Sequence, residues 1–334
     1  MNLYIFSIFI IFLSFLLILL CNKNSFLMNR TGDLHQEYVG YSDTPLAGGV
    51  IIFSSMVISS FYQFNSIFWY LAAMFFIGLL SDLKKLNSPM IRFLLQLLLI
   101  IFCVYSSNII LNTTKIVFLD YLLGNYLFSI FFTSFCILII INGSNFIDGI
   151  NSLVIGYYII VSSALFLLQN NGFQFSFNFP INLLIICLLV LYFLNLFNKL
   201  YLGDSGAYLL GFLFSVELIN FYSQTIISPF FIILLLWYPA FENLFSIFRK
   251  TNFKKSPVIP DTNHLHQLIF AFFKSKNYSS IKANNITGIS INTYNAIILL
   301  LATINPAHTQ FQITLIIVNL LIYTFLYMRL FKYR

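Results

Sequence analysis

Long apolar runs separated by short polar clusters occupy nearly the whole chain. A helix needs roughly 20 apolar residues to cross a bilayer, and the pattern predicts about eleven such helices. The expected spans are 3–21, 47–64, 67–80, 89–106, 126–141, 151–168, 181–197, 207–222, 226–243, 291–305 and 311–328. The runs at 67–80 and 126–141 are short for a bilayer, so we expect their helices to continue into the polar motifs that follow.

The composition indicates the same class of protein. Of the 334 residues, 60% are hydrophobic and only 8% are charged, and the mean hydropathy is +0.90. These values exclude a soluble globular protein and leave no room for a large ectodomain. The four cysteines lie far apart without a CxxC pair, so neither a disulfide framework nor a zinc site is expected. We therefore predict a single all-α polytopic membrane domain over residues 1–334.

The distribution of positive charge predicts the orientation of this domain. The first Lys or Arg is Lys23, which follows the first apolar run and argues against a cleaved signal peptide. If the N-terminus lies outside, every one of the 17 Lys and Arg residues except Lys115 falls on the inner side, as the positive-inside rule requires. The C-terminus is then cytosolic. The cytosolic loops expected to carry the chemistry lie near 22–46, 81–88, 142–150, 198–206 and 244–290.

Three aspartates mark the inner ends of predicted spans. Asp82, Asp148 and Asp204 each stand between long apolar helices, where an ionisable group is costly and by default marks function. Glycines beside them let the backbone approach a ligand. Carboxylate and amide oxygens suit Mg²⁺, which completes its coordination with water and substrate phosphates, and Mn²⁺ is an expected substitute. We predict that all three aspartates are catalytic and that Asp148 and Asp204 hold the metal.

Other interpretations of these motifs stay open. Asn145 and Asp148 could cap a helix, although this segment carries more polar residues than a cap needs. His264 and His266 stand two residues apart and project together only from an extended segment, so they do not form a helical HxxxH metal pair. Histidines beside a basic cluster can donate to phosphate oxygens, or the cluster is a basic surface loop. The residues predicted to bind substrate are Asn145, Asn151, Lys84, Arg249, His264 and His266.

Several stretches, in order, resemble one family, the polyprenyl-phosphate N-acetylhexosamine-1-phosphate transferases of glycosyltransferase family 4. They are 44–49, 78–85, 142–153, 202–211, 239–250 and 256–267. The resemblance implies a bundle of ten or eleven helices. It also implies that cytosolic loops transfer a sugar-1-phosphate from a UDP-sugar to a polyprenyl phosphate such as undecaprenyl phosphate, with Mg²⁺ and release of UMP.

The resemblance also implies roles for single residues. Asp82 corresponds to the second aspartate of the family's Asp-Asp pair, Asn145 and Asp148 to its Asn-x-x-Asn-Phe-x-Asp-Gly motif, and Asp204 to its Gly-Asp-x-Gly motif. His264 and His266 correspond to its histidine-rich loop. Asp82 is then expected to orient the lipid phosphate, and a route in which Asp82 is a covalent nucleophile stays open.

The chain departs from the family pattern at three positions. Ser81 replaces the first aspartate of the pair, Asn151 stands where many members have an aspartate, and Leu46 replaces a common arginine. A phosphate monoester is already mostly ionised at pH 7, so no strong base is needed. We therefore expect activity, and an inactive scaffold would rest on Ser81 alone.

The sequence 263–267 resembles the N-acetylhexosamine branch of the family, and it predicts a UDP-N-acetylhexosamine donor. The expected product initiates a lipid-linked surface glycan, such as a lipopolysaccharide O-antigen, at the bacterial cytoplasmic (inner) membrane. Peptidoglycan-type phospho-MurNAc-pentapeptide transfer is the alternative within the family. A secondary transporter is the alternative in another class, but its site would lie near the bilayer midplane between internal repeats. Membrane lipid is an expected partner, nucleic acid is not, and a homodimer is left open.

Overall fold

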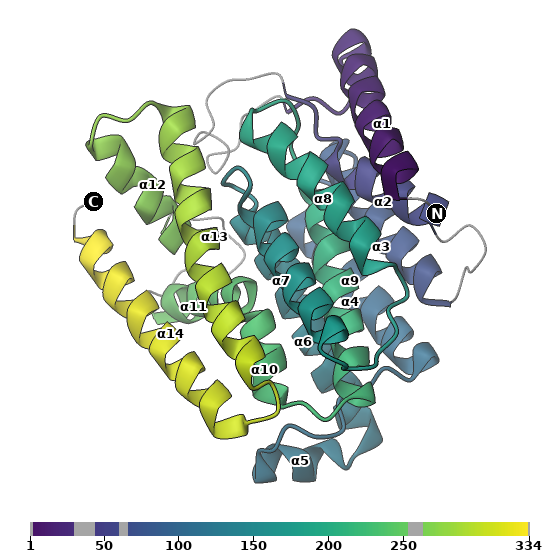
Figure 1. The fold of residues 1–334 in the computed structure, drawn as a ribbon, viewed down its shortest axis with the longest axis vertical. Coiled ribbons are helices and arrows are strands. Elements are labelled where there is room, and N and C mark those ends of the chain that lie inside the picture. The colour runs from purple at the N-terminus through teal and green to yellow at the C-terminus, as the bar shows by residue number, and fades with distance from the viewer. Residues whose placement is uncertain (1–2, 30–43, 60–65, 253–262, 333–334) are drawn as a thin grey trace.

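The computed structural model describes residues 3–29, 44–59, 66–252 and 263–332 as one bundle of helices (Figure 1). Its helices are α1 (Leu3–Asn24), α2 (Gly48–Ser59), α3 (Ser66–Asp82), α4 (Pro89–Ser107), α5 (Val117–Leu123), α6 (Tyr126–Ile147), α7 (Leu153–Asn170), α8 (Ile181–Leu196), α9 (Gly203–Gln224), α10 (Pro229–Leu235), α11 (Trp237–Asn252), α12 (Leu265–Ser275), α13 (Ser280–Ile304) and α14 (Thr309–Phe331). In these ranges the only extended pairing is a single bridge between Met28 and Pro45.

Every predicted span contains a helix. Among the described residues, seven helices are long and apolar enough to cross a membrane, and the bent pair α10–α11 makes up to eight. The shorter apolar helices α2, α3 and α8 occupy the other three predicted spans. The chain is therefore an all-α polytopic membrane protein, as predicted. The number of eleven crossings and the orientation stay predictions, because no membrane is present.

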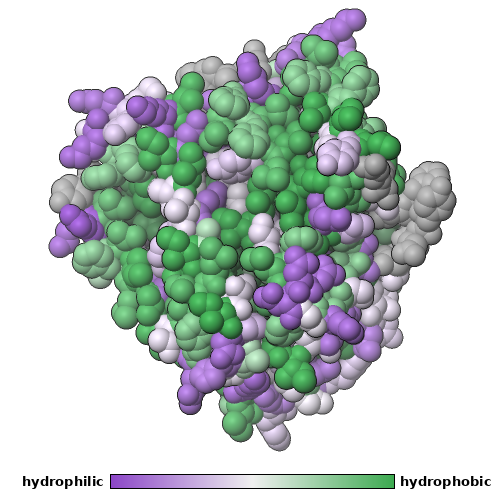
Figure 2. Space-filling model, viewed as in Figure 1, coloured by the Kyte–Doolittle hydropathy of each residue, from purple (hydrophilic) through white to green (hydrophobic). Residues whose placement is uncertain are grey.

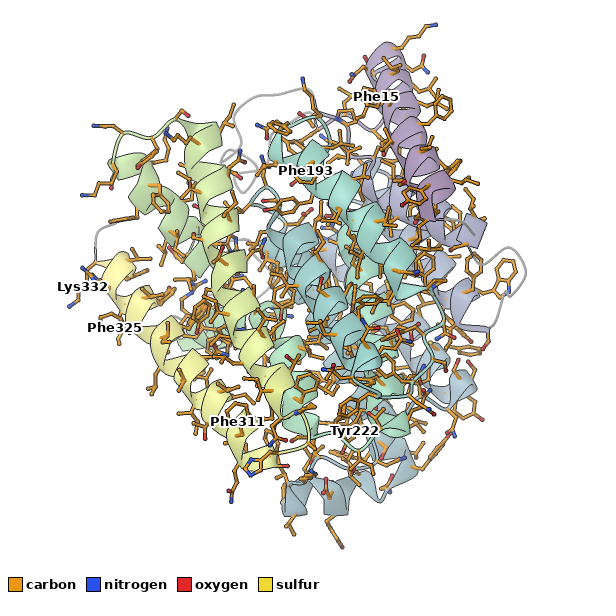
Figure 3. All side chains as sticks on the ribbon, viewed as in Figure 1. Phe15, Phe193, Tyr222, Phe311, Phe325 and Lys332 are labelled. Carbon is orange, nitrogen blue, oxygen red and sulfur yellow. The ribbon has the colours of Figure 1, made fainter. Side chains whose placement is uncertain are left out.

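The outer surface of the bundle is apolar, and its centre is one helix. Hydrophobic residues cover most of the face seen in Figure 2, and Phe15, Phe193 and Phe325 point outward in Figure 3, each more than half exposed. A soluble monomer rarely exposes so much contiguous apolar surface. At the centre, α9 packs against α2, α3 and α6, and every residue from Ser205 to Ile219 is buried. The polar ends of α9 are thus fixed by the helices around it.

The two short predicted spans do continue into their polar motifs. Helix α3 runs to Asp82 and α6 runs to Ile147, one residue before Asp148. Helix α9 also begins earlier than the predicted span 207–222. It starts at Gly203, so that Asp204 lies in its first turn. Much of what the sequence assigned to cytosolic loops is therefore the end of a helix. Parts of those segments, residues 30–43 and 253–262, lie outside the described residues.

The predicted span 226–243 is not one straight helix, because α10 and α11 meet there at 80°. Pro239 follows the break and has no backbone N–H to donate to the carbonyl of Leu235, four residues earlier. The buried hydroxyl of Tyr157 donates to that carbonyl instead, at 2.9 Å. On α6, a Cβ at Gly143 would lie 2.0 Å from the carbonyl oxygen of Pro239, so only glycine lets α6 approach the bend. The backbone carbonyl that the break frees is thus hydrogen-bonded by a side chain of a neighbouring helix.

The predicted orientation can be checked by labelling single cysteines in intact cells. The native cysteines are buried or half-buried, so their background should be low. A cysteine replacing Asn171, which is exposed between α7 and α8, should react with a membrane-impermeant maleimide. A cysteine replacing Lys199, exposed between α8 and α9, should react only after permeabilisation. The reverse pattern would invert the topology.

Candidate active site at the first turn of α9

The first turn of α9 is held by two of the predicted aspartates. The backbone N–H groups of Asp204 and Ser205 donate to Asp82, at 2.8 Å to Oδ1 and 3.0 Å to Oδ2. The N–H of Gly203, whose φ is +76°, donates to the carboxylate of Asp148. The first N–H groups of a helix have no partner within the helix, and they carry partial positive charge. Carboxylates from the ends of α3 and α6 thus cap α9.

Glycines make this approach of three helices sterically feasible. A Cβ at Gly78 of α3 would lie 2.4 Å from Cα of Ser205, and a Cβ at Gly49 of α2 would lie 2.4 Å from the nitrogen of Gly206. Helix α2 also begins against this turn, because the N–H of Gly48 donates to the carbonyl of Tyr201 at 3.0 Å. Glycines from three of the sequence motifs therefore allow the same close packing, that of α2 and α3 against the first turn of α9.

The side chain of Asp204 collects polar groups from three other helices. Its Oδ2 accepts from Ser81 Oγ at 2.6 Å and from Arg92 Nη1 at 2.7 Å, and its Oδ1 accepts from Asn145 Nδ2 at 2.6 Å. The Asp204 side chain is 26% exposed, so it can be reached from solvent. The structure therefore brings together Asp82, Asp148, Asp204 and Asn145, as the sequence analysis expected.

The electrostatics of this aspartate cluster favour a bound cation. Burial, together with the negative charges of Asp204 and Asp82, raises the pKa of Asp148 well above its ordinary value. In the part of the chain that is described, no group of three His, Cys, Asp or Glu side chains is arranged to bind an ion by itself. Mg²⁺ commonly uses one or two protein carboxylates and takes its other ligands from water and phosphates. The donors therefore fit a cation whose coordination a phosphate substrate would complete.

A second cluster forms around Glu242 in α11, which is buried. Its carboxylate accepts from the hydroxyl of Tyr238 and from the N–H of Leu265, each at 3.2 Å, and lies 3.0 Å from His264 Nδ1. The ring of His266 stacks on that of His264, with centroids 5.4 Å apart. His266 Nδ1 is 3.8 Å from Glu242 Oε1, too far for a hydrogen bond. Burial lowers the pKa of His266, which favours the neutral ring.

Two consecutive residues of α6 connect the clusters. Asn145 donates to Asp204, and the ring of Phe146 packs on His264 with centroids 5.6 Å apart. Arg249 donates to the carbonyl of Asn263 and, at 2.8 Å, to the hydroxyl of Tyr327, so it braces the start of the histidine segment. The aspartate cluster and the histidine cluster thus each contact the C-terminal end of α6, while Arg249 contacts the start of the histidine segment and α14.

The other two predicted substrate-binding residues lie in different surroundings. Asn151 is buried, its N–H donates to Asn284 at 2.7 Å, and its side chain donates to Asn198. Asn151 therefore joins the residues just before α7 to α13 through its N–H and to the segment after α8 through its side chain. Lys84 is exposed in the turn that follows α3.

Two residues of the site were missed by the sequence analysis as functional candidates. Arg92 was counted only as a topological charge, although a single charge inside the apolar run 89–106 is a signal of function. Glu242 lies in the stretch 239–250 that carries the family resemblance, but no spacing in the sequence indicates that it meets His264. Both positions depend on contacts between distant helices.

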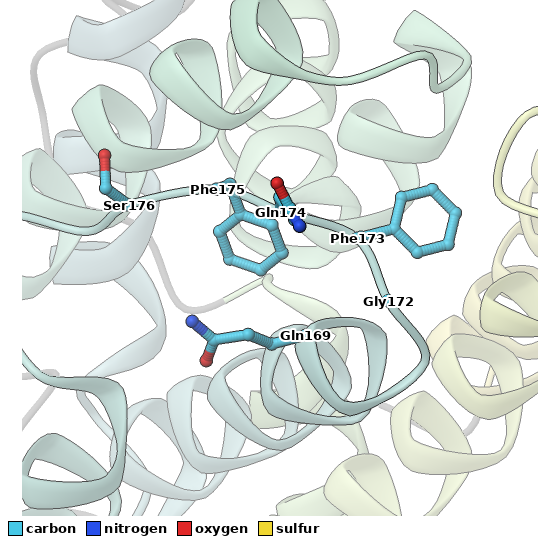
Figure 4. Close-up of a pocket in the computed structure, with 6 residues that line it drawn as sticks. All are labelled: Gln169, Gly172, Phe173, Gln174, Phe175 and Ser176. Carbon is cyan, nitrogen blue, oxygen red and sulfur yellow. The ribbon is translucent and has the colours of Figure 1, made fainter.

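A pocket of about 580 Å³ lies elsewhere, between the end of α7 and the residues that follow it (Figure 4). It is lined by Gln169, Gly172, Phe173, Gln174, Phe175 and Ser176. The N–H of Ser176 donates to Gln224, the last residue of α9. Helix α9, about 30 Å long at 1.5 Å per residue, separates this pocket from the aspartates. The pocket is therefore not part of the candidate site.

A comparison with known protein families matches the middle of the chain. A family model described as glycosyl transferase family 4 matches residues 64–222. This range contains Asp82, Asp148 and Asp204 and ends before the histidine cluster. Over this part, the chain is similar to glycosyl transferase family 4. The aspartate cluster thus lies in the matched part, and Glu242 lies beyond it.

Several curated relatives are similar over part of their length. A probable undecaprenyl-phosphate N-acetylglucosaminyl 1-phosphate transferase of Bacillus subtilis is 28% identical over 59% of this chain and 55% of the relative. An undecaprenyl-phosphate alpha-N-acetylglucosaminyl 1-phosphate transferase of Thermotoga maritima is 26% identical over 67% of each chain. A decaprenyl-phosphate N-acetylglucosaminephosphotransferase of Mycolicibacterium smegmatis is 30% identical over 38% and 37%. The match thus spans about half the length of the first relative.

The capping contacts predict different consequences for two aspartates. Asp82→Asn should lower stability by about 1–3 kcal/mol, because an amide can accept one N–H of α9 but leaves the other facing its NH₂ group. Asp204→Asn should lower stability less, because its partners are side chains and it is partly solvated. Thermal unfolding of both variants in the same detergent measures the difference. Equal losses of stability in the two variants would contradict the capping role of Asp82.

Proposed function

We propose that the protein transfers an N-acetylhexosamine-1-phosphate from a UDP-N-acetylhexosamine to a polyprenyl phosphate and releases UMP. The observation that carries the proposal is the convergence of Asp82, Asp148 and Asp204 at the N-terminal turn of α9. A helix N-terminus beside carboxylates that favour a cation suits a diphosphate substrate. The relatives in family 4 are named for transfer of N-acetylglucosamine-1-phosphate to undecaprenyl or decaprenyl phosphate.

In this mechanism, Asp148 and Asp204 would hold Mg²⁺ or Mn²⁺. The metal would neutralise negative charge on the diphosphate as the bond to UMP breaks. A lipid phosphate oxygen attacks the phosphorus that carries the sugar, and the bond from that phosphorus to the oxygen of the UMP phosphate breaks. Asn145, which donates to Asp204, fixes the direction of that carboxylate.

Asp82 acts in this scheme by holding the turn that carries Asp204. Both of its carboxylate oxygens accept backbone N–H groups of α9. An attack by Asp82 on phosphorus would have to break these hydrogen bonds, so direct attack by the lipid phosphate is favoured over a covalent intermediate. Because that phosphate is mostly ionised at pH 7, Ser81 does not prevent the reaction.

The histidine cluster is assigned to the UDP-sugar. Glu242 orients His264 through a 3.0 Å contact, and the same ring packs on Phe146, the neighbour of Asn145 in α6. A ring held in this way can donate to a diphosphate oxygen. The expected setting is the cytosolic face of a bacterial cytoplasmic membrane, where the product would initiate a lipid-linked surface glycan. The collection of acidic groups at helix ends, rather than at helix centres, disfavours a transporter.

The reaction can be tested with purified protein in detergent. UMP release should require both a UDP-N-acetylhexosamine and undecaprenyl phosphate, and chelation of divalent cations should stop it. Asp148→Asn and Asp204→Asn should lower turnover by at least about 100-fold, because a lost electrostatic contact of this kind costs several kcal/mol in the transition state. UMP release only from UDP-MurNAc-pentapeptide would favour the peptidoglycan-type alternative. No UMP from any UDP-sugar would contradict the proposed function.

The role of the histidine cluster has a separate test. His264→Ala should raise the KM for the UDP-sugar more than the KM for the lipid, because the lost contact belongs to the soluble substrate. His308→Asn is the control, since it changes a histidine at the start of α14 and keeps a residue that can cap that helix. An unchanged donor KM with a raised lipid KM would reverse the assignment.

A further inference from the structure

Arg92 and Ser81 both donate to one oxygen, Oδ2, of the proposed metal ligand Asp204. Its Nη1 lies 2.7 Å from Asp204 Oδ2, and the same nitrogen donates to Ser81 Oγ at 2.6 Å. Ser81 in turn donates to the same oxygen of Asp204 at 2.6 Å. A positive side chain and a hydroxyl group therefore already contact the carboxylate to which the proposed function assigns a divalent cation.

The contact between Arg92 and Asp204 can be exchanged for a contact between Arg92 and another anion. The side chains of Arg92 and Asp204 are 23% and 26% exposed, and partly solvated ion pairs of this kind are weak. Both contacts of Arg92 use Nη1, and its buried Nε has no hydrogen-bond partner among the described residues. The guanidinium group can therefore leave Asp204 at a small cost in free energy. Its N–H groups other than those of Nη1 can then donate hydrogen bonds to an anion.

We propose that Arg92 is an internal counter-ion that competes with the divalent cation for Asp204 and is taken up by a substrate phosphate when the metal binds. The inference rests on the proposed function, because it assumes that Asp204 is a metal ligand. Two cations cannot share one carboxylate oxygen without repulsion, so the metal and Arg92 exclude each other there. A phosphate that receives Arg92 removes the competitor. Metal and phosphate consequently bind cooperatively.

Because residue 81 is a serine in this chain, Arg92 has no carboxylate partner other than Asp204 in this contact. A carboxylate at position 81, as the family pattern has, would offer Arg92 a partner of its own and leave Asp204 to the metal. The hydroxyl of Ser81 carries no charge, so Arg92 pairs with Asp204 itself. The substitution therefore strengthens the competition and should weaken metal binding in the absence of a phosphate.

Direct measurement of Mn²⁺ binding tests this competition without a turnover assay. Free Mn²⁺ is followed by electron paramagnetic resonance with the full-length protein in detergent, without nucleotide or lipid. Arg92→Gln should bind Mn²⁺ about fivefold or more tightly than the wild type, since a neighbouring positive charge is gone. Ser81→Asp should also bind more tightly. Lys85→Gln is the matched control, because it removes an exposed charge just after α3, and it should change the affinity less than twofold.

The second half of the experiment identifies the phosphate that receives Arg92. Either UDP, as a nucleoside diphosphate, or a short-chain prenyl monophosphate is added at matched free Mn²⁺. One of them should tighten Mn²⁺ binding to the wild type severalfold and should have little effect on Arg92→Gln. A response to UDP assigns Arg92 to the donor, and a response to the prenyl monophosphate assigns it to the lipid acceptor. If neither anion tightens binding, the coupling is overturned.

The remaining outcomes separate this inference from the proposed function. If Arg92→Gln binds Mn²⁺ no more tightly than the wild type while UMP release is observed, the counter-ion inference fails and the function stands. If Asp204→Asn binds Mn²⁺ as tightly as the wild type, the metal assignment fails, and the counter-ion inference fails with it. If the wild type binds Mn²⁺ and responds as expected but releases no UMP from any UDP-sugar, the reaction is wrong and the competition at Asp204 stands.

Discussion

The N-terminal turn of α9 is the point on which the site depends. Its unpaired N–H groups face the ends of α3 and α6, and carboxylates from those ends satisfy them. Gly49 and Gly78 bring α2 and α3 into backbone contact with the same turn, and Asp148, which follows α6, reaches the turn through its carboxylate. A helix at the centre of an apolar bundle is thereby fixed by polar contacts at one end, and the residues that make those contacts are the ones proposed to carry the chemistry.

The same demand for internal hydrogen bonding shapes the rest of the bundle. In lipid, each freed backbone group needs a partner from the protein. Tyr157 supplies one at the break before α11, where Pro239 cannot donate to Leu235. Buried asparagines supply others: Asn284 accepts from the N–H of Asn151 where α7 approaches α13.

The two polar clusters divide the work of the site between different parts of the chain. The aspartate cluster belongs to the part that matches family 4, whereas the cluster around Glu242 lies beyond it. Asn145 and Phe146 connect them, one through Asp204 and the other through His264. A change in the second cluster can thus alter the environment of the first without touching an aspartate. This arrangement suits recognition of a large substrate by a small set of charged groups.

The sequence by itself determined the class of protein and the positions of nearly all its helices, and it singled out the three aspartates that meet at the first turn of α9. These follow from local signals. The length of an apolar run predicts a membrane-spanning helix, and a charged residue between two such runs is unusual enough to indicate function. The sequence did not determine that Asp82 caps α9, that Arg92 pairs with Asp204, or that Glu242 meets His264. Such pairings join residues that are far apart in sequence, and only the packing of the helices decides which of them meet. The bend before α11 had a local signal in Pro239, but its stability comes from Tyr157 on another helix. Tertiary structure thus decided the roles of these residues, because hydrogen bonds and ion pairs act over a few ångströms in space and not along the chain.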